Sequence, residues 1–209
     1  MKEFILFDYP LPRDSEIESI WQQISSLRHD VYATELQQYN ANQEQQLEDP
    51  GRHFIACMIE GKLAGYVSLN PPTEKKFRVE NYFTKEDLEN TIFSHGEDRL
   101  ETTYEVRALT VSPDLRGQHI SYKLMKYAVE FVLQNQGTDV IGMGHSDVVD
   151  LYQKIGMTVF ENCAVKYGET LYHPMHINPQ NALQRNAARI KKLGADEEEG
   201  VCYHGGQSW

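Results

Sequence analysis

Residues 102–144 contain a strand–helix–strand pattern, and this pattern constrains the fold more than any other feature of the sequence. The run TTYEVRALTV, residues 102–111, predicts a strand, and the turn SPDLRG leads from it into a helix. The apolar residues of that helix share one face: Ile120, Leu124, Tyr127, Ala128, Phe131 and Val132. After Gly137, the run DVIGMG predicts a second, buried strand. Because a helix connects the two strands, we expect them to pair in parallel.

Elements on both sides extend this unit into one α/β (α+β) domain. The run EFILFDY, residues 3–9, predicts a strand, and the segment after it has apolar residues at helical spacing. Residues 53–60 and 62–69 are two adjacent apolar runs, which predict an antiparallel hairpin. Near the C-terminus, SDVVDLYQKIG predicts a short helix that ends at Gly156, and a closing hairpin follows.

The composition fits a soluble globular protein and argues against two classes of partner. The chain has 209 residues and a formal net charge of -11. This negative charge disfavours nucleic acid, since Lys and Arg normally supply that affinity by neutralising phosphates. No apolar run approaches the roughly 20 residues that span a bilayer, so we predict a cytoplasmic protein without membrane contact. The three cysteines lack CxxC spacing, which predicts reduced, largely buried thiols and neither a disulfide framework nor a zinc site.

Four segments lie outside this core pattern. Residues 37–51 are rich in glutamine and predict a loop that could cover a site, and residues 73–99 predict a surface insertion with a short helix. Residues 178–193 predict a basic helix, and residues 194–209 predict an acidic, Gly-rich tail or linker. We therefore assign the domain to residues 1–177, and the unfinished end of the tail leads us to expect that an adjoining domain could follow.

The turn between the first strand and its helix is suited to an anion. The first backbone N–H groups of a helix have no partner within the helix, and their partial positive charge favours phosphate. Arg116 adds a fixed charge beside them. The alternative is that Pro113 and Asp114 simply begin the helix and that Arg116 is solvated.

Two segments of the chain resemble the GNAT superfamily of N-acyltransferases. YEVRALTVSPDLRGQHISYKLM, residues 104–125, is similar to the family's motif A, and DLYQKIGM, residues 150–157, is similar to its LYEKLGF segment. Their order and separation also fit, so the resemblance covers most of residues 3–176. It implies a GNAT-like acyl-CoA N-acyltransferase fold, in which a mixed, twisted sheet is flanked by helices. In that fold the fourth and fifth core strands splay apart to admit the pantetheine arm of an acyl thioester.

The resemblance also implies where a donor binds. Acetyl-CoA or another acyl-CoA would be the co-substrate, without a metal, and the pantetheine would bond backbone groups around Leu109 and Val111. His145 lies where many family members carry an asparagine that contacts pantetheine, although it could instead cap the following helix. The loop that holds the pyrophosphate corresponds to six residues: Arg116, Gly117, Gln118, His119, Ile120 and Ser121.

Two side chains would carry the proton transfers by this resemblance. Glu105 would act as a general base, through a water, on the substrate ammonium, and partial burial would usefully raise its pKa. Its alternative role is an ion pair with Arg107, which lies two residues away on the same face of the strand. Tyr152 matches the family's tyrosine that protonates the departing thiolate, and its alternative is a half-buried aromatic residue on a short helix.

Residues on the first helix are candidates for the acceptor. Arg28, Tyr32 and Glu35 lie at i, i+4 and i+7, where they could bind a substrate carboxylate or amine or could form a solvated face. His173 and His176 lack a third ligand at a recognisable spacing, so they do not predict a zinc site.

The phosphate loop departs from the family pattern. The family sequence R-G-x-G-x-G/A has small residues where this chain has His119 and Ser121. Either the pyrophosphate is bound less closely, with His119 adding a contact, or the donor is an acyl carrier protein, which presents only phosphopantetheine.

These features predict an N-acyltransferase that moves an acyl group, most often acetyl in this family, from acyl-CoA to a primary amine of a small molecule or amino acid. One alternative is a carrier-protein-dependent N-acyl amino acid synthase, because LRHDVYATEL and KYGETLYHPM resemble that branch and the related acyl-homoserine-lactone synthases. Another is a non-catalytic sensor or scaffold domain. The sequence leaves the oligomeric state open, and a homodimer is one alternative, since GNAT domains often pair.

Overall fold

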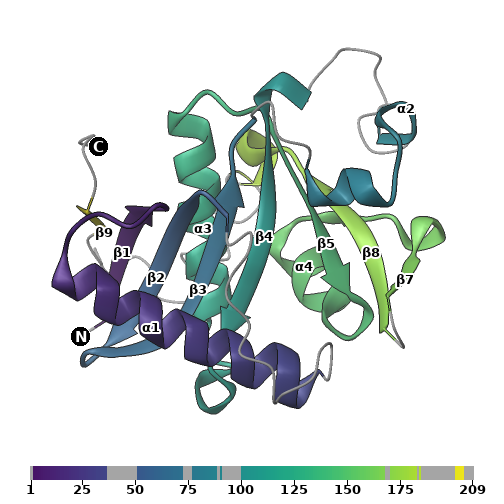
Figure 1. The fold of residues 1–209 in the computed structure, drawn as a ribbon. Helices are drawn as coiled ribbons and strands as arrows, with labels where there is room; N and C mark the ends of the chain where they lie inside the picture. Colours follow the sequence, from purple (N-terminus) through teal and green to yellow (C-terminus); the bar gives the residue numbers. More distant parts are fainter. Residues whose placement is uncertain are drawn as a thin grey trace. The chain divides into compact units, whose positions relative to one another are not determined.

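A computed structural model describes residues 2–36, 51–72, 77–88, 90, 100–167, 170–182, 184 and 201–204. The chain forms two compact units. Unit 1 comprises residues 1–69, 108–125 and 197–209, and unit 2 comprises residues 70–107 and 126–196. Figure 1 labels most of the helices and strands.

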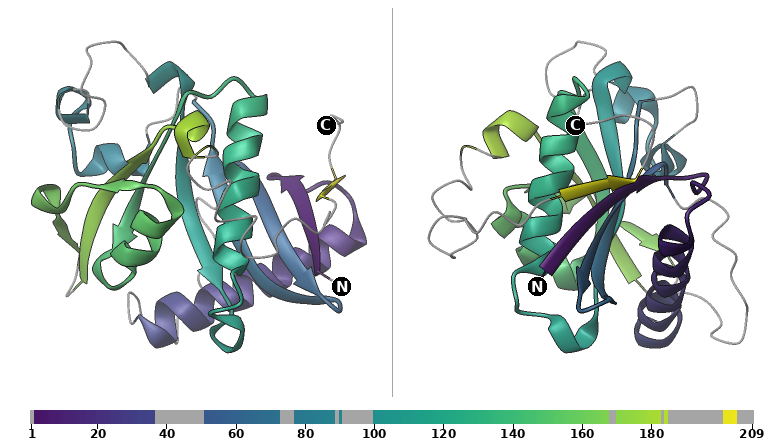
Figure 2. Two further views of the ribbon diagram at one scale, coloured as in Figure 1. Left: turned by 180° about the vertical axis from the view of Figure 1, so that it is seen from behind. Right: turned by 90° about the vertical axis from the view of Figure 1, so that its left-hand side faces the viewer.

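Unit 1 is built on a mixed sheet. The strands β1 (Lys2–Asp8), β2 (His53–Ile59) and β3 (Lys62–Asn70) pair antiparallel in sequence order, as the predicted hairpin requires. The C-terminal half of β4 (Thr103–Val111) belongs to this unit, and the N–H of Ser112 just after it donates to the carbonyl of Ala64 at 2.9 Å. The short strand β9 (Val201–His204) pairs parallel with β1 (Figure 2). The expected tail or linker over residues 194–209 did not include this strand.

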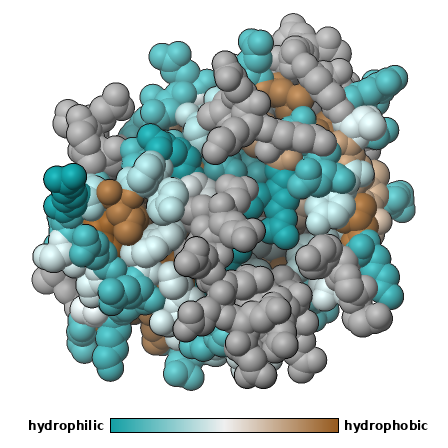
Figure 3. Space-filling view, viewed as in Figure 1, coloured by the Kyte–Doolittle hydropathy of each residue, from teal (hydrophilic) through white to brown (hydrophobic). Residues whose placement is uncertain are grey.

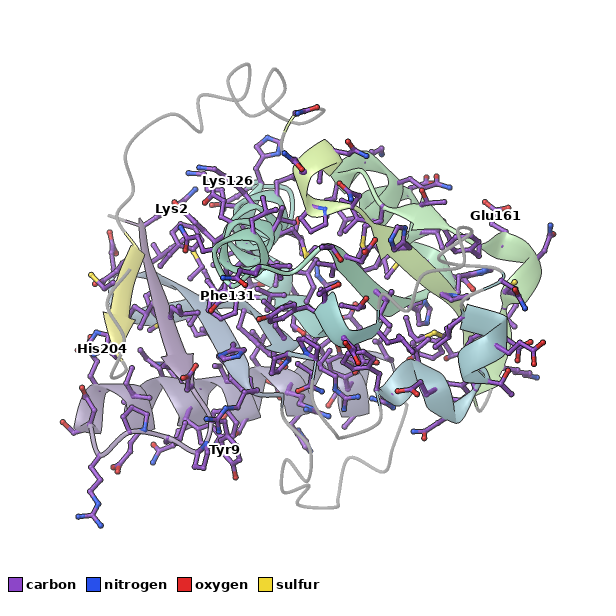
Figure 4. All side chains as sticks on the ribbon, turned by 90° about the horizontal axis from the view of Figure 1, so that it is seen from above. Lys2, Tyr9, Lys126, Phe131, Glu161 and His204 are labelled. Atoms are coloured by element: carbon purple, nitrogen blue, oxygen red, sulfur yellow. The ribbon has the colours of Figure 1, made fainter. Side chains whose placement is uncertain are left out.

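One helix, α1 (Ser15–His29), covers a face of the β1–β3 strands (Figure 1). Asp14 caps its N-terminus by accepting from the N–H of Glu16 at 2.9 Å, which satisfies one of the free donors of the first turn. Aromatic stacking adds to this core, and Tyr9, which Figure 4 labels, stacks on Trp21 with a centroid distance of 5.2 Å. The helix contributes three fully buried side chains to the core: Ile17, Ile20 and Ile24.

Unit 2 contains the predicted parallel pair. The N-terminal half of β4 pairs with β5 (Asp139–His145) over four register positions, from Thr103–Asp139 to Val106–Gly142. β5 then pairs antiparallel with β8 (Thr170–Ile177), which also pairs with β6 (Thr158–Val159) and β7 (Val165–Tyr167). Both units therefore contain mixed sheets flanked by helices, and the predicted fold class is confirmed.

The helices of the chain's second half follow the sequence pattern. The crossover helix α3 (Ile120–Gln134) begins in unit 1 and continues in unit 2, where Phe131 packs edge-on against Tyr104 at 6.2 Å. The helix α4 (Val149–Ile155) ends at Gly156, which adopts a left-handed φ of 105° as predicted for a C-terminal glycine. None of the helices in the described part of the chain has the length and apolar character needed to cross a membrane.

The segment before β4 differs from its prediction as a surface insertion. It contains a 3₁₀ turn (Arg78–Asn81) and the short helix α2 (Lys85–Asp87). Phe77, Val79 and Leu88 are buried in one cluster with Ile141 of β5. The prediction was wrong for these residues because their apolar side chains have irregular spacing and so produce no periodic signal.

The remaining predictions for segments lie largely outside the described residues. These are the loop at 37–51, most of the insertion at 73–99, and the basic helix at 178–193 beyond its first turn.

Figure 3 shows hydrophilic residues over much of the face that it displays. Among the described residues, the large hydrophobic side chains that are exposed are Val148 and Leu171.

Candidate functional site

The carboxylate of Glu105 is buried in unit 2, with 2 % of the residue exposed. Its Oε1 accepts a hydrogen bond from the backbone N–H of Val79 at 2.9 Å, and its Oε2 lies 3.6 Å from Nη1 of Arg107. Burial raises the pKa of Glu105, and the Arg107 charge and the hydrogen bond from Val79 offset only part of that rise. The ion pair with Arg107, one of the two roles predicted for Glu105, is therefore present, and the role as general base stays a prediction.

The hydrogen bond from Val79 could not be predicted from sequence. It comes from the 3₁₀ turn Arg78–Asn81, in which the N–H of Phe77 donates to the Glu80 carboxylate at 2.6 Å. This turn covers Glu105 and removes it from solvent. The one available signal was the pair of apolar residues Phe77 and Val79 within an otherwise polar stretch.

Tyr152 lies on α4 and is buried, with 8 % of the residue exposed. Its ring packs against the backbone of β5, because a Cβ added at Gly144 would lie 3.1 Å from Tyr152 Cδ2 and 2.6 Å from Met175 Sδ. Glycine at position 144 therefore allows the helix to approach the strand closely. The aromatic residue is more buried than the half-buried alternative suggested.

Glu105 and Tyr152 approach β5 from opposite faces. Glu105 pairs in register with Ile141, which packs beside Val79, whereas Tyr152 packs on Gly144. Residues 141 and 144 of a strand point to opposite faces. The described ladder between β4 and β5 ends at Val106–Gly142, so the last three residues of β5 lie beyond it.

His145 is the last residue of β5, and it caps the turn that follows. Its Nδ1 accepts from the N–H of Asp147 at 3.0 Å, and its ring meets Tyr172 edge-on at 5.7 Å. The structure therefore contains the capping contact predicted as one of its two roles. Since Nδ1 is the acceptor, a neutral ring carries its proton on Nε2, which can still donate to a ligand.

The predicted phosphate loop lies in unit 1 and has two left-handed residues. A 3₁₀ turn (Pro113–Leu115) is followed by Gly117 with φ 85° and His119 with φ 61°. A residue other than glycine in this region costs about 1 kcal/mol or more. Position 119 is one of the two departures from the family pattern, and its backbone still adopts the conformation that glycine would take. Leu109 and Val111 are half-buried on β4, and Gln118, Ile120 and Ser121 complete the loop and start α3.

The three acceptor candidates make two different contacts. Arg28 lies over the ring of Tyr32, 5.8 Å from its centroid. Glu35 instead pairs with Arg116: Nη1 donates to Oε1 and Nη2 donates to Oε2, both at 2.6 Å. Hydrogen bonds from Arg116 lower the pKa of Glu35, and the carboxylate raises the pKa of Arg116.

The helical spacing assumed for these residues fails after His29. Residues Asp30–Glu35 form a π-helix, shown by the hydrogen bond from the N–H of Leu36 to the carbonyl of Val31 at 2.8 Å. Each π-helical turn takes up one residue more than an α-helical turn, so the i, i+4, i+7 face is lost.

The histidines of β8 have separate partners. His176 Nε2 lies 2.6 Å from Oδ1 of the buried Asp139, and His173 Nε2 lies 3.2 Å from Ser146 Oγ. Cys57 is buried as predicted, but Cys163 is only partly buried and Cys202 is exposed on β9, so the expectation of largely buried thiols was wrong for these two.

Comparison with known proteins assigns the family. The chain matches the family model "Acetyltransferase (GNAT) family" over residues 17–157, and it belongs to this family. The predicted resemblance to the GNAT superfamily is thus confirmed. A search of the curated proteins gives no match.

Several solved structures share the fold. One is BjaI, a CoA-dependent acyl-homoserine lactone synthase with SAM and isopentyl-CoA: TM-score 0.66, 15 % identity, covering 100 % of this chain and 96 % of BjaI. An acyl-CoA N-acyltransferase from Pseudomonas aeruginosa has a TM-score of 0.58 and 15 % identity, covering 84 % of this chain and 99 % of that one. An aminoglycoside 6'-N-acetyltransferase complexed with coenzyme A has a TM-score of 0.53 and 12 % identity, covering 83 % and 96 %. At these identities the likeness shows the fold alone.

Proposed function

We propose that the protein transfers an acyl group from acyl-CoA to a primary amine of a small molecule or amino acid. The observation that carries this proposal is the buried Glu105, whose pKa is raised, on the strand of a GNAT-family chain that leads into the phosphate loop. A carboxylate with a raised pKa is a better proton acceptor near neutral pH than an ordinary one.

The proposed reaction is a direct attack without a covalent enzyme intermediate. Glu105 takes a proton from the substrate ammonium, through a water, and the neutral amine then attacks the thioester carbonyl. The C–N bond forms, the C–S bond breaks, and Tyr152 gives its proton to the departing thiolate. The nitrogen then loses its second proton as the amide forms, and this proton restores the Tyr152 hydroxyl through solvent. In unit 2, the N–H of His145 Nε2 is the proposed contact for pantetheine. In unit 1, the backbone of β4 at Leu109 and Val111 is proposed to contact pantetheine, and the loop from Arg116 to Ser121 is proposed to contact phosphate.

A second candidate is transfer from an acyl carrier protein to an amino acid. It is favoured by the engagement of Arg116 with Glu35, because a donor with a single phosphate depends less on this arginine than a donor with a pyrophosphate does. The likeness to the lactone-synthase fold is compatible with it.

The test is release of free thiol. The protein is mixed with acetyl-CoA, longer acyl-CoAs or acyl carrier protein and a panel of amines and amino acids. We expect thiol release with at least one acyl-CoA. Release only from the carrier protein would support the second candidate. No release with any donor, together with no CoA binding by calorimetry, would reject the enzyme and leave the sensor or scaffold alternative.

A further inference from the structure

The ion pair between Glu35 and Arg116 occupies the guanidinium that the donor loop offers. Both terminal nitrogens of Arg116 donate to the two oxygens of one carboxylate, each at 2.6 Å. This bidentate geometry is also the one by which arginine binds a phosphate. A phosphate that uses Arg116 in the same way must therefore displace Glu35.

The pair is accessible enough for such an exchange. The side chain of Arg116 is 47 % exposed and that of Glu35 is 40 % exposed, so solvent and solutes reach both groups. Separating them requires no opening of the core. A carboxylate released in this way would be solvated, and a phosphate carrying more negative charge could take its place.

The local backbone directs Glu35 toward the loop. Glu35 is the last residue of the π-helix that follows α1, and π-helical segments often occur at functional sites. The partner lies 81 residues further along the chain, directly before the left-handed Gly117. The contact between Glu35 and Arg116 thus lies between a π-helix on one side and a left-handed turn residue on the other.

We propose that Glu35 is an internal competitor for the donor's phosphate at Arg116, so that donor binding exchanges one ion pair for another. This inference rests on the proposed function, in which Arg116 binds donor phosphate. The exchange adds the same cost to every donor that uses Arg116, whether coenzyme A or phosphopantetheine. The exchange adds no such cost to the binding of a ligand without a phosphate.

The experiment measures binding of coenzyme A, 4'-phosphopantetheine and pantetheine by calorimetry. The proteins are the wild type, Glu35→Gln, Arg116→Ala, the double variant, and Glu18→Gln. Glu18 is exposed on α1, the helix that precedes the π-helix of Glu35, so its substitution removes an equal charge elsewhere.

We expect Glu35→Gln to tighten binding of coenzyme A and phosphopantetheine about two- to fivefold, the range of an exposed ion pair. Pantetheine affinity should not change, and Glu18→Gln should behave as the wild type. Arg116→Ala should weaken the phosphate ligands, and adding Glu35→Gln to it should have no further effect.

Three results would overturn the inference. The first is equal affinity of the wild type and Glu35→Gln for coenzyme A. The second is a gain in pantetheine affinity in Glu35→Gln as large as the gain in coenzyme A affinity. The third is a failure of both proteins to bind coenzyme A. Failure of the proposed function looks different: coenzyme A binds and Glu35→Gln tightens it, yet no acyl-CoA releases thiol with any amine.

Discussion

Each of the two units contains an ion pair between a glutamate and an arginine, and the pKa of the glutamate is shifted in opposite directions in the two pairs. In unit 2, Glu105 is 2 % exposed and meets Arg107 through one contact of 3.6 Å, and burial raises the pKa of Glu105. In unit 1, Glu35 is 40 % exposed and meets Arg116 through two contacts of 2.6 Å, which lower the pKa of Glu35.

The difference shows that an arginine neighbour alone does not decide the protonation of a carboxylate. Desolvation penalises the charged form of Glu105 more than a single, longer contact with Arg107 favours it. Glu35 stays partly exposed to solvent and gains two short hydrogen bonds. We therefore expect changes in unit 2 to alter the chemical step and changes in unit 1 to alter donor affinity and stability.

The largest effect is expected from Glu105→Gln. The amide can still accept from Val79 but cannot take a proton, so kcat should fall about 100- to 10,000-fold, the range of a general base. Steady-state rates with the best acyl-CoA and amine measure this. Glu101→Gln is the matched control, because Glu101 is exposed shortly before the same strand. A kcat within about threefold of the wild type would reject the role of Glu105 as a general base and leave only its role in the ion pair with Arg107.

Tyr152→Phe should have the next largest effect. The ring keeps its packing on Gly144, but the hydroxyl proton is lost, so kcat should fall about 100-fold. This is the lower end for a general acid, because a thiolate leaves more easily than an alkoxide or amide. Coenzyme A affinity measured by calorimetry should stay near that of the wild type. Weaker binding with an unchanged kcat would show that Tyr152 only holds the donor.

The sequence predicted those parts of the site that depend on local pattern. The strand with Glu105, the loop at Arg116 and the helix with Tyr152 each have a periodic apolar signal or a turn of recognisable composition. The parallel pairing of β4 with β5 follows from their helical connection. These features involve neighbouring residues, so a single sequence contains them.

The parts that were missed depend on contacts between distant residues. Val79 donates to Glu105 across 26 positions, and Arg116 donates to Glu35 across 81 positions. The π-helix before Leu36 has no compositional signal, since the sequence DVYATE fits an α-helix equally well. The strand β9 is four residues long and pairs with the distant strand β1.

Arg107→Met should move the pH dependence of the rate. Arg107 lowers the pKa of Glu105 against the effect of burial, so its removal lets this pKa rise further. The general base must be deprotonated, and kcat/KM therefore falls as pH drops through that pKa. We expect this acidic limb to move upward by about one pH unit, with a rate about tenfold lower below it. Arg107→Lys keeps the charge and should leave the acidic limb where it is in the wild type. If the acidic limb lies at the same pH in the wild type, Arg107→Met and Arg107→Lys, Arg107 has no electrostatic effect on Glu105.

The smallest effect is expected from Glu35→Gln on thermal stability. Because Arg116 holds the pKa of Glu35 below its ordinary value, the ion pair stabilises the fold above that ordinary value, and this contribution is lost as pH falls through the lowered pKa. Near neutral pH the Tm of Glu35→Gln should thus lie about 1–3 °C below that of the wild type, and the difference should vanish at acidic pH.

High salt should shrink the same difference, because both groups are exposed to screening ions. Glu18→Gln, measured in parallel, should show no pH-dependent difference. A Tm gap that persists at acidic pH and high salt would mean that Glu35 stabilises unit 1 by packing instead of charge. A phosphate could then bind Arg116 without any exchange, and the contrast between the two Glu–Arg pairs would reduce to burial alone.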